Sequence, residues 1–227
     1  YVGDMTSRSA PALPANPQRG AARAALIAAA HQLVKRQGYA ATSVDDICRA
    51  AGVTKGAFFH HFASKEALGV AAAEAWTARA APLFSEPPYA RLPDPLDRLL
   101  GHIDFRASLI GGAAEDYTCF VGTMVQEAHA SSAAIRDASG ASIAAYAERL
   151  AEDIAAAFDE YGIAAGPDAS ISALSLAYHI QAVLQGSFVI AKARNDPAAA
   201  RDSVAHLKRY VTMIFARDAT TMTGTGD

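Results

Sequence analysis

The segment from Thr42 to Leu68, TSVDDICRAAGVTKGAFFHHFASKEAL, constrains the fold more than any other part of the chain. Ser43 followed by two aspartates is typical of a helix start, because a hydroxyl and carboxylates suit the free N–H groups there. Gly52 is suited to the left-handed residue that ends such a helix. Thr54 is placed to cap a second helix of about two turns, which is too short to be stable without tertiary packing. The segment therefore predicts two short helices joined by a glycine turn.

The flanking residues predict two longer helices. Apolar residues recur on one stripe between Arg19 and Gln37, and Gly38 is expected to end that helix. Ser64 is expected to cap a further helix that opens at Lys65. The first 70 residues thus predict a three-helix unit and the start of a fourth helix. A short helix after a glycine turn is the arrangement that places one helix in the DNA major groove.

The ordered set of residues resembles the N-terminal domain of the TetR family of bacterial transcriptional regulators. That family's pattern is roughly T-x-x-x-I-A-x-x-A-G-V-[ST]-x-G-x-x-Y-x-H-F-x-x-K-x-x-L. The matching residues are Ile47, Ala51, Gly52, Val53, Thr54, Gly56, His61, Phe62, Lys65 and Leu68. Cys48 departs from the usual alanine, and Phe59 replaces a tyrosine whose hydroxyl commonly reaches a DNA phosphate. Beyond Trp76 the resemblance is one of helix layout only.

The resemblance implies an all-α protein with two parts. The first is an N-terminal three-helix helix-turn-helix domain, and the second is a larger C-terminal helical domain for effector binding and dimerisation. We expect a disordered arm over residues 1–17, the DNA-binding domain over 18–64, the larger domain over 65–217 and a flexible tail over 218–227.

The distribution of charge supports DNA binding independently of the resemblance. Residues 1–65 hold eight Lys or Arg against three Asp or Glu, whereas residues 66–227 hold 12 against 20. Clustered cations neutralise phosphates and make binding depend on salt. The alternative, an ordinary solvated helix face, would not place the basic excess on the same segment as the motif.

Geometry assigns roles within the DNA-binding segment. The first residues of a recognition helix contact base edges, and the flanking residues contact the backbone. Lys55 is the best candidate for a guanine contact, and Gly56 would permit close approach. Arg19 and Arg23 would reach phosphates or an adjacent minor groove, whereas His61 is expected to pack. The predicted DNA-contacting residues are Arg19, Arg23, Ser43, Thr54, Lys55, Gly56, Ala57, Phe59, His60 and Lys65.

The rest of the chain is alanine-rich and periodic, which predicts helices and no strand. Five prolines between Pro82 and Pro95 predict a loop or a broken connection. Helices are expected over 96–110, 118–129, 133–161, 167–194 and 197–217. Residues 169–191 hold no charged side chain, and we expect a buried helix there and no contact with a membrane.

The cysteines and the N-terminal segment bear on location. Two cysteines do not make a disulfide framework or a zinc site, and no secretory signal pattern is visible. We therefore expect a cytoplasmic protein without metal or cofactor.

The last helix carries apolar residues at spacings of three and four, as in a helix-pairing seam. The alternative is that this stripe only covers the core of its own domain. The resemblance implies that the two final helices pair with their copies, giving a homodimer on a palindromic double-stranded DNA operator. Two copies about 34 to 36 Å apart would contact successive major-groove faces.

The resemblance also implies that a small-molecule effector binds among the middle helices and releases a repressor from its operator. Candidate lining residues are Phe105, Tyr117, Cys119, Phe120, Met124, Tyr146, Tyr178 and His179, each of which is otherwise ordinary core. Cys119 lies at an expected helix start, where a helix dipole favours a reactive thiolate. It is either a sensor of electrophiles or oxidants, or a buried structural cysteine.

Two other classes of protein compete with a regulator. An enzyme is disfavoured because the chain has no G-x-S-x-G, H-E-x-x-H, Walker or dinucleotide-binding motif. A helical ligand carrier or adaptor without a DNA role is disfavoured by the basic N-terminal segment.

Overall fold

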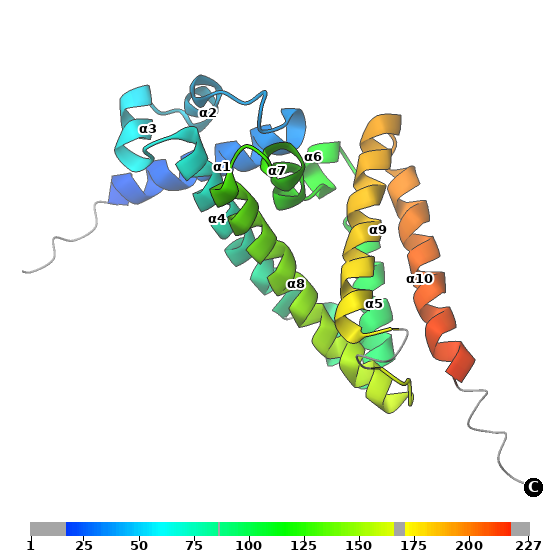
Figure 1. Cartoon of the computed structure of the whole chain (residues 1–227). Helices are drawn as coiled ribbons and strands as arrows, with labels where there is room; N and C mark the ends of the chain where they lie inside the picture. The colour runs from blue at the N-terminus through cyan, green and yellow to red at the C-terminus, as the bar shows by residue number, and fades with distance from the viewer. Residues whose placement is uncertain (1–16, 86, 166–170, 219–227) are drawn as a thin grey trace, which may run out of the picture.

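The computed structural model describes residues 17–85, 87–165 and 171–218. These residues form ten α-helices and one short 3-10 helix, with no strand among them. The prediction of an all-α fold is confirmed. Figure 1 shows the first three helices gathered at one end of the molecule, with the last helices running side by side at the other.

The N-terminal end is built from α1 (Pro17–Gln37), α2 (Val44–Ala51) and α3 (Lys55–His61). Ser43 and Asp46 form a reciprocal capping box, in which each side chain accepts the other's backbone N–H at 3.1 Å. Gly52 ends α2 with a φ of 65°, in the left-handed region. Thr54 Oγ1 accepts the N–H of Ala57 at 3.2 Å and so caps α3. Each of these local signals acts as the sequence predicts.

Packing holds the short helices in place. Phe58 and Phe62 are buried together with Leu26 of α1 and Ile47 of α2. A helix of two turns has little stability of its own, so this burial keeps α3 formed.

The helix α4 (Lys65–Ser85) connects the two ends of the molecule and packs against α1 and α8 (Ala133–Glu160). The prediction of a loop from Pro82 is wrong, because α4 continues through Pro82 to Ser85. A proline near the end of a helix removes one backbone donor and does not have to stop the helix. The 3-10 helix η1 (Pro88–Arg91) and then α5 (Pro95–Ser108) follow.

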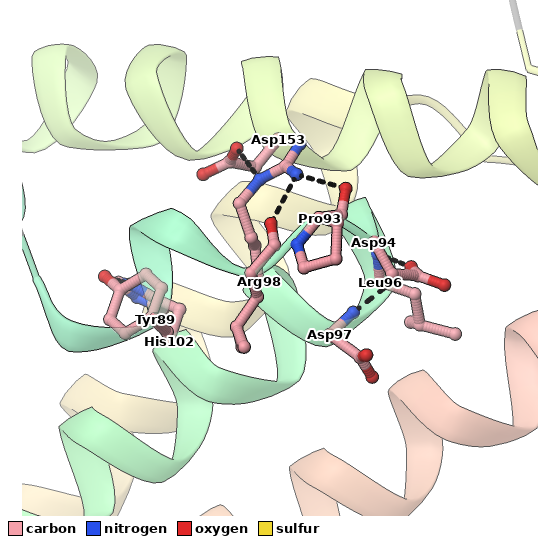
Figure 2. A network of polar contacts seen from close by, with 9 residues as sticks. Tyr89, Pro93, Asp94, Leu96, Asp97, Arg98, His102 and Asp153 are labelled. Carbon is pink, nitrogen blue, oxygen red and sulfur yellow. Dashed lines mark hydrogen bonds and ion pairs between the residues drawn. The ribbon is translucent and has the colours of Figure 1, made fainter.

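Arg98 fastens the segment before α5 to the long helix α8, as Figure 2 shows. Its guanidinium donates to the carbonyls of Leu92 and Pro93 at 3.1 and 3.0 Å, and to Asp153 Oδ1 at 3.3 Å. Asp94 caps α5 by accepting the N–H of Leu96 at 2.7 Å. The proline-rich connection is therefore ordered by polar contacts.

The middle and last helices differ from the predicted boundaries at two places. The helix predicted over 118–129 is α7 (Phe120–Ala128), and a single turn that was not predicted, α6 (Ala114–Tyr117), precedes it. The helix predicted from Pro167 begins at Ala173, where the hydroxyl of Ser172 caps α9 (Ala173–Arg194). The last helix, α10 (Ala198–Asp218), begins beside Asp196, which accepts the N–H of Ala198 at 2.8 Å.

The apolar core divides into two clusters. One lies between α1, α2, α3, α4 and α7, and the other between α5, α8, α9 and α10. Cys119 contacts both clusters. α9 is long and apolar enough to cross a membrane by length and composition. In this fold it packs on α8 and α10, which is the place of a core helix in a helical domain.

The expected terminal segments lie mostly outside the described residues. Of the predicted arm over 1–17, only Pro17 is described, and it belongs to α1. Of the predicted tail over 218–227, only Asp218 is described, and it ends α10.

Candidate nucleic-acid interface

The first turn of α3 faces solvent. Thr54, Lys55 and Gly56 are exposed, as is His60 one turn further on, while Ala57 is half-buried. Phe58 alone anchors the middle of the helix in the core, with no exposed surface. The short helix thus presents one edge to the core and the opposite edge to a partner.

Lys55 is held by an acidic neighbour on the same surface. Its Nζ lies 2.9 Å from Asp45 Oδ1, and both side chains are more than half exposed. A pair as exposed as this contributes little to stability. The pair therefore leaves Lys55 free to exchange its carboxylate for a phosphate or a base edge. The sequence prediction did not include Asp45 in the site.

Gly56 has open space where a side chain would project. A Cβ built there meets only the Thr54 hydroxyl, at 3.8 Å. Glycine is thus not required at this position by the packing of the protein itself. This agrees with the prediction that Gly56 allows a close approach of the helix to DNA.

Phe59 and Arg23 complete the exposed surface. Phe59 is 52% exposed, and its ring meets Phe58 edge to face. The Arg23 guanidinium lies 5.4 Å from the ring centroid of Phe62. Arg19 lies in α1, but its side chain is outside the described part of the structure. His61 is half-buried beside Phe62, consistent with the packing role predicted for it.

Ser43 and Lys65 are more engaged by the protein than the sequence suggested. The Ser43 hydroxyl donates to Asp46 Oδ2 at 2.6 Å, and this bond is the largest cause of the lowered pKa of Asp46. The Lys65 ammonium donates to the Tyr39 carbonyl at 2.7 Å and lies over the Tyr39 ring. Burial lowers the pKa of Lys65. Phosphate contacts at these places would therefore use backbone N–H groups of the first helical turns.

The predicted effector residues fall into separate places. Phe120 and Met124 are fully buried in the cluster beneath the helix-turn-helix. Tyr117 packs on Phe188 of α9, with ring centroids 5.8 Å apart. Cys119 is the N-cap residue of α7, as predicted, and is half-buried.

Tyr146 belongs to a buried polar chain. Its hydroxyl lies 2.6 Å from His102 Nε2 and accepts from Arg106 at 3.1 Å, and Tyr89 lies 2.7 Å from the other His102 nitrogen. Burial lowers the pKa of His102 to about 3, which keeps its imidazole neutral. Burial raises the pKa of Tyr89 to about 12. Phe105 packs on Tyr89 at the edge of this chain.

Tyr178 and His179 do not line a cavity with the other effector candidates. Both are exposed on α9, and the His179 ring packs on Tyr210 of α10. The prediction that they share a pocket with Phe105 and Tyr146 is therefore wrong, because they lie on the outward face of the helix. An open groove of about 620 Å³ lies elsewhere, between α5 and α10, lined by residues such as Ile103, Val204 and Met213. Among the described residues no cluster of side chains suits a metal ion.

Two capped short helices joined by a left-handed glycine, with the second one exposed, define a helix-turn-helix protein. Residues 26–72 match the family model described as bacterial regulatory proteins, tetR family. The helix-turn-helix end of the chain is therefore similar to the DNA-binding segment of that family of regulators.

Several known proteins are similar to this chain. The transcriptional regulator AcuR of Cereibacter sphaeroides is 33% identical over 128 residues, which cover 52% of this chain and 58% of AcuR. A regulatory protein TetR from Rhodobacter sphaeroides has a TM-score of 0.71 and 25% identity, over 83% of this chain and 97% of that one. A TetR-family regulator from Agrobacterium tumefaciens has a TM-score of 0.73 at 19% identity, over 85% of this chain and 98% of that one. At 19% identity that likeness concerns the fold alone.

Proposed function

We propose that this chain is a cytoplasmic repressor that binds a palindromic DNA operator as a homodimer and is released by a small-molecule effector. The observation that carries the proposal is the exposed first turn of α3, with Lys55 and Gly56 facing outward from a rigid, capped helix. Residues 1–65, which include this helix, carry an excess of cations, and that charge has the sign that attracts phosphate.

The surface of the last two helices supports the homodimer. Tyr178, Val189 and Ile190 of α9 are exposed, as are Tyr210 and Met213 of α10. Large apolar side chains gathered on one face usually mark an interaction site. A dimer would also bring two α3 helices to successive turns of one DNA face.

The same proposal assigns a role to each domain and a binding region to the effector. Residues 18–64 would bind DNA, and residues 65–217 would bind the effector and the second copy. The effector would bind near Phe105, Tyr117, Cys119 and Tyr146, where polar groups and the two apolar clusters meet. It would act by binding one arrangement of the two DNA-binding domains more tightly than the other.

The proposal is tested with duplexes selected by the wild-type protein from a randomised double-stranded pool. The affinity for the selected duplex should fall steeply as salt is raised. Lys55→Gln should weaken binding by about tenfold or more, by loss of a base or phosphate contact. Arg91→Gln in η1 is the control, because it removes an exposed positive charge outside α3 and outside the proposed dimer face. Equal affinities for the two variants would contradict the assignment of α3.

The effector is sought by thermal shift with a panel of small molecules, and each stabilising compound is then tested for release of the selected duplex. Cys119→Ser separates the two hypotheses for that residue. If Cys119 is a sensor, the variant should lose its response to thiol-reactive compounds while keeping its affinity for DNA.

A further inference from the structure

Glu127, near the end of α7, reaches across to the loop between α1 and α2. Its Oε2 accepts the backbone N–H of Ala40 at 2.8 Å, over a sequence separation of 87 residues. Gly38 in the same loop has a φ of 91°. A Cβ at Gly38 would lie 2.5 Å from Glu127 Oε1. The loop therefore needs glycine at this point, both for its backbone conformation and to admit the carboxylate.

The opposite side of the loop is held by α4. Lys65 Nζ donates to the Tyr39 carbonyl at 2.7 Å and lies 4.2 Å from the centre of the Tyr39 ring. The Glu127 charge favours the protonated form of Lys65 and so counteracts the lowering of its pKa by burial. The loop from Gly38 to Thr42 is thus fixed between a carboxylate from α7 and an ammonium from α4.

This loop leads directly into the DNA-binding helices. The Thr42 hydroxyl donates to the Gly38 carbonyl at 2.6 Å and closes the loop. Ser43, the next residue, is the N-cap of α2, and α2 packs on α3. The loop therefore connects α2 and α3 to α7, in addition to the apolar packing of α1 and α4 on α7.

The other contacts of α7 connect it to the α9 helix. The Gln185 side chain of α9 reaches Gly122, where an added Cβ would meet its amide group. Phe120 and Met124 of α7 are fully buried beneath the helix-turn-helix. α7 thus packs against the DNA-binding end and also lies beside one side chain from a helix of the proposed dimer face.

We propose that Glu127 is a positioning residue for operator binding, which fixes the helix-turn-helix to α7 and so sets the separation of the two α3 helices in the dimer. The inference rests on the proposed function, because a separation between two α3 helices exists only in a dimer. Glu127 does not contact DNA in this scheme. It acts through the loop that carries α2.

The test measures spacing preference, which a residue important only for stability would not change. Duplexes are made from the two selected half-sites, with the distance between them native, one base pair shorter and one base pair longer. Wild-type protein should prefer the native spacing. Glu127→Ala should reduce that preference by about fivefold or more, because the coupling between α7 and the helix-turn-helix is lost. Glu148→Ala on the exposed side of α8 is the matched control and should keep the wild-type preference.

A second measurement follows the hydrogen bond itself. In Glu127→Ala the Ala40 amide should exchange with solvent about tenfold faster or more, while amides in the middle of α8 keep their rates. Glu127→Gln keeps an acceptor oxygen and should retain much of the protection of Ala40 and of the spacing preference. If Glu127→Ala does not fold, Glu127→Asp serves in its place, since it keeps the charge but is one methylene too short to reach Ala40.

The outcomes separate this inference from the function on which it rests. A folded Glu127→Ala or Glu127→Asp protein with the wild-type ratio of affinities for the three spacings would overturn the role of Glu127 and leave the repressor proposal intact. A wild-type protein that binds all spacings equally would overturn dimeric operator binding, and this inference with it.

Discussion

Gly56 is the residue at which protein stability and DNA binding make opposite demands. It lies in the first turn of α3 with no neighbouring group that a methyl would touch closely. Alanine favours a helix over glycine by up to about 1 kcal/mol. We therefore expect Gly56→Ala to unfold at the same or higher denaturant concentration. Its affinity for the selected duplex should nevertheless fall by about tenfold or more, because the methyl projects toward the bases.

Gly140 of α8 provides the control for this substitution. It also lies within a helix with open space around its Cα. Gly140→Ala should gain similar stability in urea unfolding and leave DNA affinity unchanged. A Gly56→Ala protein that binds the duplex as well as Gly140→Ala would show that α3 does not approach DNA at this residue.

His102 makes stability depend on pH. Its pKa falls from an ordinary 6.5 to about 3 in the folded protein, since burial disfavours the charged imidazole. Below pH 6.5 the unfolded chain therefore binds one more proton than the folded protein, and stability is lost as pH falls. Between pH 6.5 and about 3, protonation of His102 in the unfolded chain should lower the free energy of unfolding by about 1.4 kcal/mol per pH unit. Above pH 6.5 this loss of stability is absent.

Urea unfolding of wild type and His102→Gln between pH 7.5 and about 5 checks this slope. The wild type should lose stability faster than the variant as pH is lowered. His31, whose pKa burial also lowers, is present in both proteins and cancels in the comparison. Parallel curves for the two proteins would refute the assignment to His102.

At the scale of the element, helices with local signals were predictable and those fixed by distant contacts were not. The α2 and α3 helices carry their caps and the glycine turn within a short segment, so their boundaries agree with the prediction. Pro82 was wrongly expected to end α4, because a proline in the last turn costs only one hydrogen bond. The single turn α6 was not predicted, because four residues are too few to show a helical period.

The residues of the candidate site also divide into those with a local sequence signal and those fixed by distant contacts. Lys55 and Gly56 were predicted because a motif fixes their place at the start of a recognition helix. Glu127 carried no local signal, since its partner Ala40 lies 87 residues away in the sequence. Tyr178 was misplaced because periodicity shows which residues share a helix face, but does not show whether that face is inward or outward.

Arg98 attaches the connection between η1 and α5 to the helix α8. Its guanidinium joins two backbone carbonyls to Asp153 and is about one-fifth exposed. We expect Arg98→Ala to lower the free energy of unfolding by about 1–3 kcal/mol, because it leaves a half-buried carboxylate and two carbonyls without this donor. Arg98→Lys should recover only part of the loss, since an ammonium lacks the planar fork.

Limited proteolysis tests whether the loss of stability in Arg98→Ala is local to the connection between η1 and α5. Cleavage between Pro87 and Pro95 should be faster in Arg98→Ala than in wild type at the same fraction folded. Arg136→Ala is the control, because Arg136 pairs only with its exposed neighbour Asp137 in the described contacts. Equal cleavage rates in Arg98→Ala and Arg136→Ala would count against the attachment.

At the scale of the whole molecule, α9 and α10 leave one apolar face exposed. Val189 and Ile190 are 51% and 49% exposed on α9, and Met213 is 55% exposed on α10. Gly186, one turn before Ile190 on α9, has nothing near an added Cβ, which would allow another helix to come close. The charge-free stretch that resembled a membrane span by composition is thus half core and half proposed dimer face.

A charge placed in this face should separate the copies without unfolding them. Val189→Glu costs the single chain little, because the side chain is already half exposed, but burying that carboxylate between two copies without a partner is unfavourable. We expect light scattering at micromolar concentration to give the mass of one chain for Val189→Glu and of two chains for wild type. Affinity for the palindromic duplex should fall by about a hundredfold or more, because each α3 then binds its half-site alone. Leu92→Glu places the same charge at a partly exposed leucine outside α9 and α10 and should remain dimeric. A monomeric wild type would refute the interface.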